Sequence, residues 1–329
     1  MNGVSPGDVR AAARRLEGWV RHTPLVDSRH FGGLLKLENN QWTGAYKVRG
    51  ALNALMRQRE AGDRRPVVVA SAGNHSSGVA WAALNQGLEA IAVIPHTAPR
   101  IKVERTRNLG AQVILHGQNY DEAYEEALQI AEERGARFLH AFNDPDVMAG
   151  QGTVAVELLE ARPDVVVIPV GGGGLAAGMG TLLNDHGIAV VGAQIRGVNA
   201  MNRWMQGDRS PFTPRPTVAD GIRVRTVGST TRLICADVLD HIVEVTEAEV
   251  RETMAHLALR EQIVAEGAGA VAVAALRKVH LKGRKVAVVT GGNVDSHVLQ
   301  GVLKEVLSVS GTGGISTPSH PNLEWSPAA

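Results

Sequence analysis

Short apolar runs alternate with helical patterns along most of the chain, and this alternation constrains the fold more than any other feature. The runs cover residues 67–70, 90–94, 112–115, 165–170, 189–193 and 286–289. Uniformly apolar runs of this kind are typical of strands buried on both faces of a parallel sheet. The segments between them, such as 120–134 and 247–260, have the period of amphipathic helices. The pattern predicts an α/β protein with doubly wound, mostly parallel sheets.

Two strand-helix series are separable, which predicts two lobes. Residues 53–144 form one series, and the second begins near residue 150. We expect a small domain of residues 53–144 inserted into a large domain of residues 1–52 and 145–329, with a ligand site in the cleft between them. The segment 310–329 is rich in Gly, Ser, Pro and Thr, and we expect it to be a mobile tail.

Composition narrows the class of protein and of partner. The chain has 329 residues, 44% of them apolar and 20% charged, with a net charge of +1. These values argue against a disordered chain and against a nucleic-acid-binding protein. No stretch approaches the roughly 20 apolar residues that span a bilayer, and no secretion signal is recognisable at the start. With one cysteine, Cys235, that we expect to be a buried apolar residue, the sequence predicts a cytoplasmic protein that binds small molecules, neither nucleic acid nor membrane.

Four consecutive glycines follow the apolar run 165–170. Gly171, Gly172, Gly173 and Gly174 lead into a helical pattern that begins with Leu175. Glycines let successive N–H groups point toward one place, and a helix start adds a positive dipole end, so the loop suits a phosphate. It has neither the Lys-Ser/Thr ending of a nucleotide P-loop nor the spacing of a dinucleotide fingerprint. A tight strand-helix turn without a ligand is the alternative.

A second motif, Ser71-Ala72-Gly73-Asn74-His75, follows the first run of the small lobe. A hydroxyl, an amide and free N–H groups at one helix start suit a carboxylate. His75 is either a general base or a structural histidine, because no carboxylate or second histidine stands at triad or metal spacing.

Two further polar residues occupy informative places. Lys47 follows Tyr46 and precedes an apolar helical segment, where desolvation lowers the pKa of an amine and favours imine chemistry. A solvated surface lysine is the alternative. Thr290 follows the run 286–289, at the carboxyl end of a strand, where open α/β sheets bind ligands. A helix N-cap is the alternative for Thr290.

Taken in order, these motifs resemble the pyridoxal-phosphate (PLP) enzymes of the tryptophan-synthase β-subunit class, fold type II, and within it the threonine/serine dehydratases and serine racemases. The resemblance covers about nine-tenths of the chain, leaving only the tail. Further segments that carry it are 22–25, 36–38, 144–146, 149–153, 219–221 and 266–270.

The resemblance implies a site and a reaction. The cofactor-binding residues would be Lys47, Tyr46, Asn74, Gly171, Gly172, Gly173, Gly174, Leu175, Glu266 and Thr290. The residues that receive the substrate would be Ser71, Ala72, Gly73, Asn74 and His75. Lys47 would carry PLP as a Schiff base and remove the α-proton, with Ser71 as the second catalytic residue.

The resemblance further implies that Thr290 replaces the family's usual serine or cysteine beside the pyridine nitrogen. A neutral partner leaves that nitrogen largely unprotonated and the electron sink weak, which favours loss of a β-hydroxyl over a long-lived carbanion. The implied activity is a lyase that forms a 2-oxo acid and ammonia from a threonine- or serine-like substrate. A homo-oligomer, dimer or tetramer, is expected.

Three departures from the family pattern qualify the activity. The family's Thr-Gly-Ser-Phe-Lys is here Thr-Gly-Ala-Tyr-Lys, and it follows Trp42, which leaves room for a bulkier substrate such as phenylserine or an acidic one such as hydroxyaspartate. Ala72 stands where serine racemases carry a proton-donating serine, so racemisation is disfavoured. Gln194 and Arg196 replace an expected anionic metal ligand, so we expect no metal.

The sequence is also compatible with other functions. A serine racemase and a synthase that adds a nucleophile to the aminoacrylate would use the same cofactor. A non-catalytic PLP-binding protein is the alternative from another class.

Overall fold

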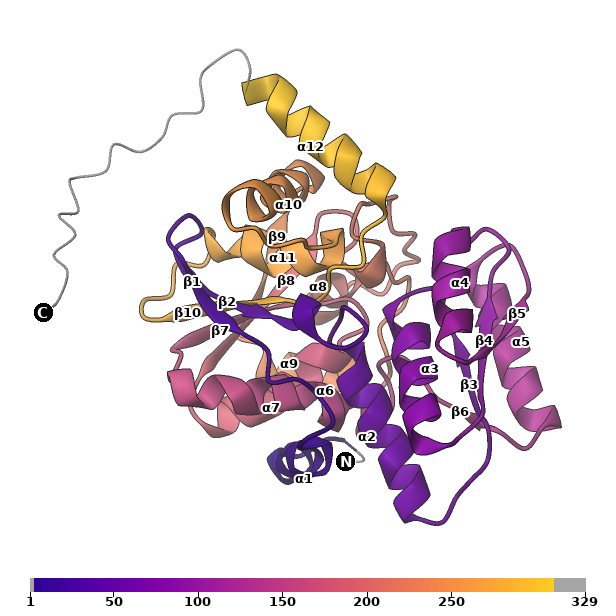
Figure 1. Cartoon of the computed structure of the whole chain (residues 1–329). Helices are drawn as coiled ribbons and strands as arrows, with labels where there is room; N and C mark the ends of the chain where they lie inside the picture. Colours follow the sequence, from indigo (N-terminus) through magenta and orange to yellow (C-terminus); the bar gives the residue numbers. More distant parts are fainter. Residues whose placement is uncertain (1–2, 311–329) are drawn as a thin grey trace, which may run out of the picture.

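The computed structural model describes residues 3–310, and its strands form two separate sheets (Figure 1). The large sheet has the order β1 (Leu25–Ser28), β2 (Gly33–Leu37), β10 (Lys285–Val289), β7 (Val165–Pro169), β8 (Ala189–Ile195) and β9 (His241–Val245). The small sheet has the order β5 (Gln112–Leu115), β4 (Ala90–Ile94), β3 (Val67–Ala70) and β6 (Arg137–Phe138). All neighbouring strands run parallel except β1 and β2, which are antiparallel. The predicted α/β fold with mostly parallel sheets is confirmed.

Twelve α-helices surround the sheets in the described part of the chain. They are α1 (Pro6–Leu16), α2 (Lys47–Glu60), α3 (Asn74–Gln86), α4 (Arg100–Asn108), α5 (Tyr120–Glu133), α6 (Pro145–Leu158), α7 (Gly174–Asp185), α8 (Ala200–Met205), α9 (Thr231–Val238), α10 (Glu247–Arg260), α11 (Gly267–Leu276) and α12 (Ser296–Ser310). Local signals place their starts. Thr246 and Glu249 form a capping box at α10, and Asp144 caps α6 ahead of a proline at its first position.

Alternate residues of each central strand face opposite layers of helices. Val165 and Val167 of β7 pack in a core with α10 and α11, whereas Val166 and Ile168 pack in a second core with α1, α6 and α7. In the small sheet, α2, α3 and α4 cover one face and α5 covers the other. Each sheet is therefore the middle of three layers, with helices on both faces, which explains why its central strands are apolar on both faces.

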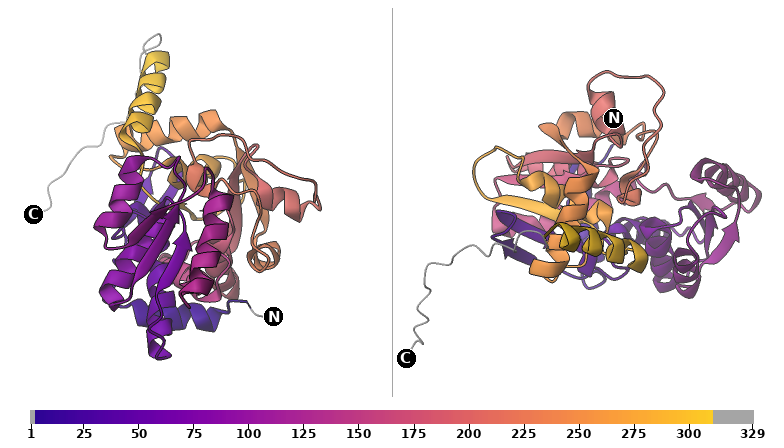
Figure 2. Two further views of the ribbon diagram at one scale, coloured as in Figure 1. Left: turned by 90° about the vertical axis from the view of Figure 1, so that its right-hand side faces the viewer. Right: turned by 90° about the horizontal axis from the view of Figure 1, so that it is seen from above.

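The strands of the small sheet all lie within residues 53–144, and those of the large sheet lie outside it. Figure 2 shows the small sheet and its helices beside the large one. The expected boundary at residues 52 and 53 falls inside α2, which packs against both α3 and α6. The division into two domains stays a prediction. The tail expected at 310–329 lies outside the described residues, except for Ser310 at the end of α12.

Within residues 3–310, no helix combines the length and the apolar composition that crossing a bilayer requires.

Candidate active site

Lys47 is the first residue of α2, and the backbone before it is anchored to the end of β10. Ala45 and Gly291 form an antiparallel bridge. Tyr46 N–H donates to the Thr290 carbonyl at 3.1 Å, and Gly292 N–H donates to the Gly44 carbonyl at 2.9 Å. Two motifs far apart in the sequence, around Lys47 and Thr290, therefore meet at the carboxyl edge of the large sheet.

The Lys47 amine lies in an environment that favours its neutral form. Its Nζ donates to the Ala141 carbonyl at 2.9 Å and lies 5.3 Å from the centroid of the Tyr46 ring. Burial lowers the pKa of Lys47 to about 8, against an opposing effect of Glu266. Burial, with Glu266, also raises the pKa of Tyr46 above its usual range. An amine with this pKa is partly neutral near pH 8 and can act as a nucleophile or base.

Close backbone contacts between helices fix the position of α2. A methyl group at Gly150 of α6 would overlap Gly50 of α2, and one at Gly178 of α7 would overlap the Met148 carbonyl of α6. Only glycine allows these approaches. Helix α6 thus holds α2, which begins with Lys47, at a fixed distance from α7, which begins in the glycine loop.

The glycine loop turns from β7 into α7 and is shaped by Phe142. Gly173 is the N-cap of α7 with φ +95°, a conformation that favours glycine, and no side chain caps this helix. A methyl group at Gly172 or Gly174 would overlap Phe142, which follows the Ala141 carbonyl that Lys47 contacts. The loop is buried from Gly172 onward, Leu175 included.

Helix α9 supports this loop from the other side. The buried Thr231 hydroxyl donates to the Gly172 carbonyl at 2.6 Å. The Cys235 thiol lies 3.5 Å from the Gly173 carbonyl, and burial raises its pKa to about 12. Cys235 is therefore the buried, neutral residue expected from the sequence.

These features fit PLP. The uncapped start of α7 presents backbone N–H groups with a helix dipole behind them, which suits the phosphate. Lys47 supplies an amine for the cofactor aldehyde. Gly171, Gly172, Gly173, Gly174 and Leu175 would hold the phosphate end.

The segment from Ser71 to His75 connects β3 with α3, as predicted. The Ser71 hydroxyl accepts a hydrogen bond from the Gly73 N–H at 3.1 Å. Ala72 packs at the edge of the small-sheet core. The N-cap of α3, Gly73, has no side-chain bond, which leaves N–H groups for a carboxylate.

His75 is buried, and its side chain serves the structure. Its Nε2 donates to the Leu139 carbonyl at 3.0 Å. Burial and the positive charge of Lys47 lower the pKa of His75 to about 3. The ring is therefore neutral, and its Nδ1 has no hydrogen-bond partner among the described residues.

Asn74, Glu266 and Asn293 form a hydrogen-bonded chain across the two sheets. Asn74 Nδ2 donates to Glu266 Oε1 at 2.6 Å, and Asn293 Nδ2 donates to Asn74 Oδ1 at 2.8 Å. Burial, reinforced by Asp220, raises the pKa of Glu266 to about 7. Thr290, three residues before Asn293, is buried. Its hydroxyl donates one long hydrogen bond, 3.4 Å, to the Ala268 carbonyl. The Thr290 hydroxyl is thus available for a second partner.

A buried ionic network lies beneath the start of α2. Arg49 donates to both oxygens of Glu38 at 2.8 Å and pairs with Glu157 at 2.6 Å. Lys36 pairs with the same Glu157 at 2.5 Å. The side chains of Arg49 and Glu38 are 1% and 0% exposed. The network ties α2 to β2 and α6.

The side-chain amide of Gln194 forms hydrogen bonds with the backbone of the fold. Its amide donates to the Val170 carbonyl at 2.8 Å and accepts from Asn202 N–H at 2.9 Å, while Arg196 is exposed. Residues 3–310 contain no group of three or more His, Cys, Asp or Glu side chains arranged to hold a metal.

Sequence reasoning missed Phe142 and the Ala141 carbonyl, which connect Lys47 to the glycine loop. Both follow β6, a strand of only two residues. The useful signal was their position after a strand of the small sheet, but a strand this short has no detectable pattern.

Comparison with known proteins places the chain in a family. The family described as "Pyridoxal-phosphate dependent enzyme" matches residues 16–291. An L-threonine ammonia-lyase of Thermotoga maritima is 44% identical over 317 residues, covering 92% of this chain and 79% of the relative. Among solved structures, a threonine deaminase of T.th. has a TM-score of 0.83 at 34% identity, covering 88% of this chain and 99% of the other. A PLP-dependent aspartate racemase has a TM-score of 0.85 at 30% identity, covering 90% and 98%. The chain therefore belongs to the pyridoxal-phosphate dependent enzymes, in the fold-type-II group of the threonine and serine dehydratases.

Proposed function

We propose that this protein is an ammonia-lyase that dehydrates a β-hydroxy amino acid of the threonine and serine type to a 2-oxo acid and ammonia. The observation that carries the proposal is the Lys47 amine, with its pKa lowered to about 8, in a chain 44% identical to a curated L-threonine ammonia-lyase. Lys47 would carry the cofactor, Asn74 would bond its 3′-oxygen, Thr290 would bond its ring nitrogen, and Glu266 would lie near the ring.

The chain's own groups supply binding and proton transfer. Bound PLP supplies an electron sink that makes the α-proton of an attached amino acid acidic. The Lys47 amine, which would hold the cofactor before the substrate binds, would be the base that accepts this proton. The substrate β-hydroxyl then leaves as water, and hydrolysis gives the 2-oxo acid and ammonia. Thr290, which is neutral, keeps the sink weak and so favours this departure.

The substrate carboxylate is held by the turn from Ser71 to His75. The Ser71 hydroxyl and the free N–H groups at the start of α3 supply donors, and the positive end of the helix dipole adds to them. The buried His75 ring is engaged with Leu139, so His75 contributes its backbone.

A panel of β-hydroxy amino acids tests the function. We expect the holoenzyme to release 2-oxo acid and ammonia from at least one of L-threonine, L-serine, phenylserine and 3-hydroxyaspartate. A protein that binds PLP but releases no 2-oxo acid from any of them is a binding protein, and the proposal is then wrong. Product formation that requires an added nucleophile indicates a synthase instead.

We also propose that the protein works in the cytoplasm as a homo-oligomer, a dimer or tetramer, with no nucleic-acid or membrane partner. The net charge of +1 and the single buried cysteine support the location and the absence of nucleic acid. Light scattering on the purified holoenzyme tests the assembly, and a monomeric mass would contradict it.

A further inference from the structure

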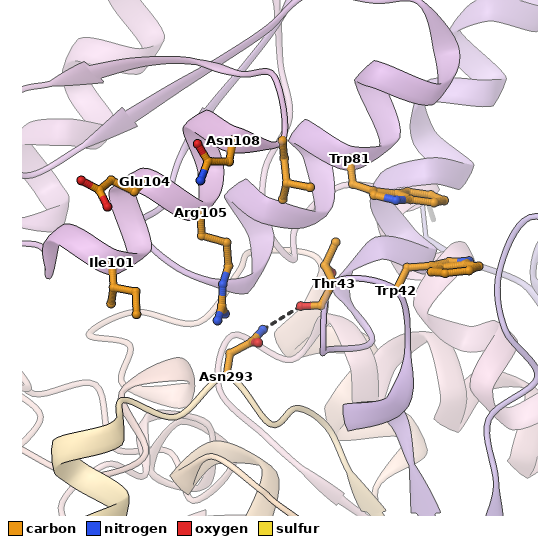
Figure 3. A pocket seen from close by; sticks show the side chains of 9 residues that line it. Trp42, Thr43, Trp81, Ile101, Glu104, Arg105, Asn108 and Asn293 are labelled. Atoms are coloured by element: carbon orange, nitrogen blue, oxygen red, sulfur yellow. Dashed lines mark hydrogen bonds between the residues drawn. The ribbon is translucent and has the colours of Figure 1, made fainter.

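A pocket of about 590 Å³ opens between the two sheets beside the candidate active site. Figure 3 shows its residues. From the small-sheet side, Trp81 of α3 with Arg105 and Asn108 of α4 line it, and from the large-sheet side Trp42, Thr43 and Asn293 do so. A volume of this size is typical of sites for small molecules.

The pocket is linked to the candidate active site by hydrogen bonds of Asn293, which lines it. Asn293 Nδ2 donates at 2.8 Å to the Thr43 carbonyl and at 2.8 Å to Asn74 Oδ1 (Figure 3 shows the first of these bonds). Asn74 in turn donates a hydrogen bond to Glu266, and Thr43 lies four residues before Lys47 in the sequence. A group in this pocket is therefore next to the residues that hold the cofactor.

Arg105 is a positive charge that the fold leaves without a partner. On the same helix, Arg100 pairs with Glu104 at 2.6 Å and Lys102 pairs with Asp220 at 2.5 Å. The Arg105 side chain makes no ion pair or hydrogen bond with any residue of the described chain, and in Figure 3 it extends toward Asn293. The one carboxylate of the lining, Glu104, is paired with Arg100, so Arg105 is the charged lining residue that has no ion-pair partner among the described residues.

The other groups in the pocket suit an anion more than a ring. The Thr43 hydroxyl has no hydrogen-bond partner among the described residues, but it is buried, so the accessible donor is the exposed Arg105 guanidinium. The two indoles are already engaged, since Trp42 stacks on Trp81 with centroids 6.2 Å apart and the Arg21 guanidinium lies 3.8 Å from the Trp42 centroid. The positive charge also reaches the site, because Lys102 and Arg105 lower the pKa of Glu266 against the larger effect of its burial.

We infer that this pocket binds the side-chain carboxylate of the substrate through Arg105, and that the preferred substrate is an acidic β-hydroxy amino acid of the 3-hydroxyaspartate class. The inference rests on the proposed function and narrows it. A guanidinium binds a carboxylate with charge-assisted hydrogen bonds, which the methyl group of threonine cannot accept.

Arg105→Ala tests the inference, with Arg107→Ala as the control. Arg107 is, like Arg105, an exposed arginine of α4, but it does not line the pocket. The measurement is kcat/KM of the holoenzyme for L-threo-3-hydroxyaspartate divided by that for L-threonine. We expect Arg105→Ala to lower this ratio by about 10- to 100-fold, mainly through KM, as expected for loss of a charged hydrogen bond. Arg107→Ala should change the ratio less than about twofold.

The same measurements distinguish failure of the pocket assignment from failure of the proposed function. If the parent turns over threonine but not 3-hydroxyaspartate, or if Arg105→Ala leaves the ratio unchanged, the inference is wrong and the proposed function stands. If no β-hydroxy amino acid is turned over, the proposed function is wrong. Binding of L-aspartate, followed by the fluorescence of the Trp42–Trp81 pair, still decides the pocket in that case, because the inference requires it to weaken at least about tenfold in Arg105→Ala.

A competition experiment with a free dicarboxylate distinguishes a substrate pocket from a regulatory site. Succinate should compete with 3-hydroxyaspartate if the pocket belongs to the substrate. If succinate instead activates threonine turnover without competing, and Arg105→Ala abolishes that activation, the pocket is a regulatory anion site and the substrate assignment is wrong.

Discussion

Asn74 Nδ2 lies 2.6 Å from Glu266 Oε1, and this bond joins the first residue of α3 to the N-cap of α11. It is a contact between the small-sheet and large-sheet sides of the site. The acceptor is a carboxyl group whose pKa burial raises to about 7 from 4.5. The protonation of Glu266 is therefore coupled to folding.

The stability of the cofactor-free protein should fall between pH 4.5 and pH 7 because of Glu266. A raised pKa means that the folded state binds more protons than the unfolded state in this window, so the contribution is complete below pH 4.5 and is lost as the pH rises through 7. Urea unfolding at several pH values should show a less negative slope in Glu266→Gln, by at most about 1.4 kcal/mol per pH unit. Parallel pH profiles of parent and variant would rule the shifted pKa out.

Lys47→Ala should abolish covalent cofactor attachment and lyase activity, because the amine that bonds Ala141 is removed. The near-visible absorbance of the bound cofactor and the mass after borohydride reduction measure the effect. Lys282→Ala, at an exposed lysine, is the control and should retain both. Cofactor that stays covalently bound in reduced Lys47→Ala would show that another lysine carries it.

Elimination should greatly exceed racemisation, because the methyl group of Ala72 cannot donate a proton. Chiral chromatography of the products from L-serine gives the ratio of D-serine to pyruvate. Ala72→Ser should raise this ratio. If the parent forms D-serine as fast as pyruvate, a different residue is the proton donor and the interpretation of Ala72 fails.

Replacing Thr290 should change cofactor binding and turnover according to the new side chain. Thr290→Ser keeps a hydroxyl and should change little, whereas Thr290→Val should cost roughly 0.5–1.5 kcal/mol of cofactor binding, or more if the ring nitrogen is left unpaired. Thr290→Asp should stabilise a protonated ring and slow elimination. The elimination rate and near-visible spectrum of the three variants are compared with the parent. An unchanged rate and spectrum in Thr290→Asp would mean that Thr290 does not face the nitrogen.

Arg49→Ala should destabilise the protein by about 3–5 kcal/mol, because it leaves the fully buried Glu38 without its partner. The free energy of urea unfolding measures the loss. Arg100→Ala removes an ion pair at a side chain that is 90% exposed and should cost at most about 1 kcal/mol. Equal effects in the two variants would contradict the role given to the buried pair.

The sequence predicted the central strands, which are buried on both faces, and missed the edge strands except β5, which it predicted at residues 112–115 although that strand is partly exposed. Strand β7 was predicted because all its residues are apolar and lie between two helical layers. Strand β9 was missed because it lies at an edge and carries a histidine and a glutamate within five residues. Strands β1 and β2 form a hairpin outside the strand-helix alternation.

The site was predictable where a motif is continuous in sequence. Lys47 and the glycine loop satisfy that condition. Arg105 and Trp81 do not, because only the packing of α3 and α4 against the large-sheet side brings them to Trp42 and Asn293. No local pattern distinguishes these side chains from ordinary helix residues.

The glycine contacts between α2 and α6 have a consequence for motion. Helix α2 packs on α3 of the small-sheet side and on α6 of the large-sheet side, so we expect any rotation between the two sides to be centred near this helix. Lys47 lies at the end of α2 that is bonded to Gly291 and its neighbours, so it stays with the stationary half. The turn at Ser71, which we propose binds the substrate carboxylate, and Arg105 both belong to the small-sheet side and would move with it. We therefore expect such a rotation to separate the proposed substrate contacts from Lys47, which would keep the cofactor at the large sheet.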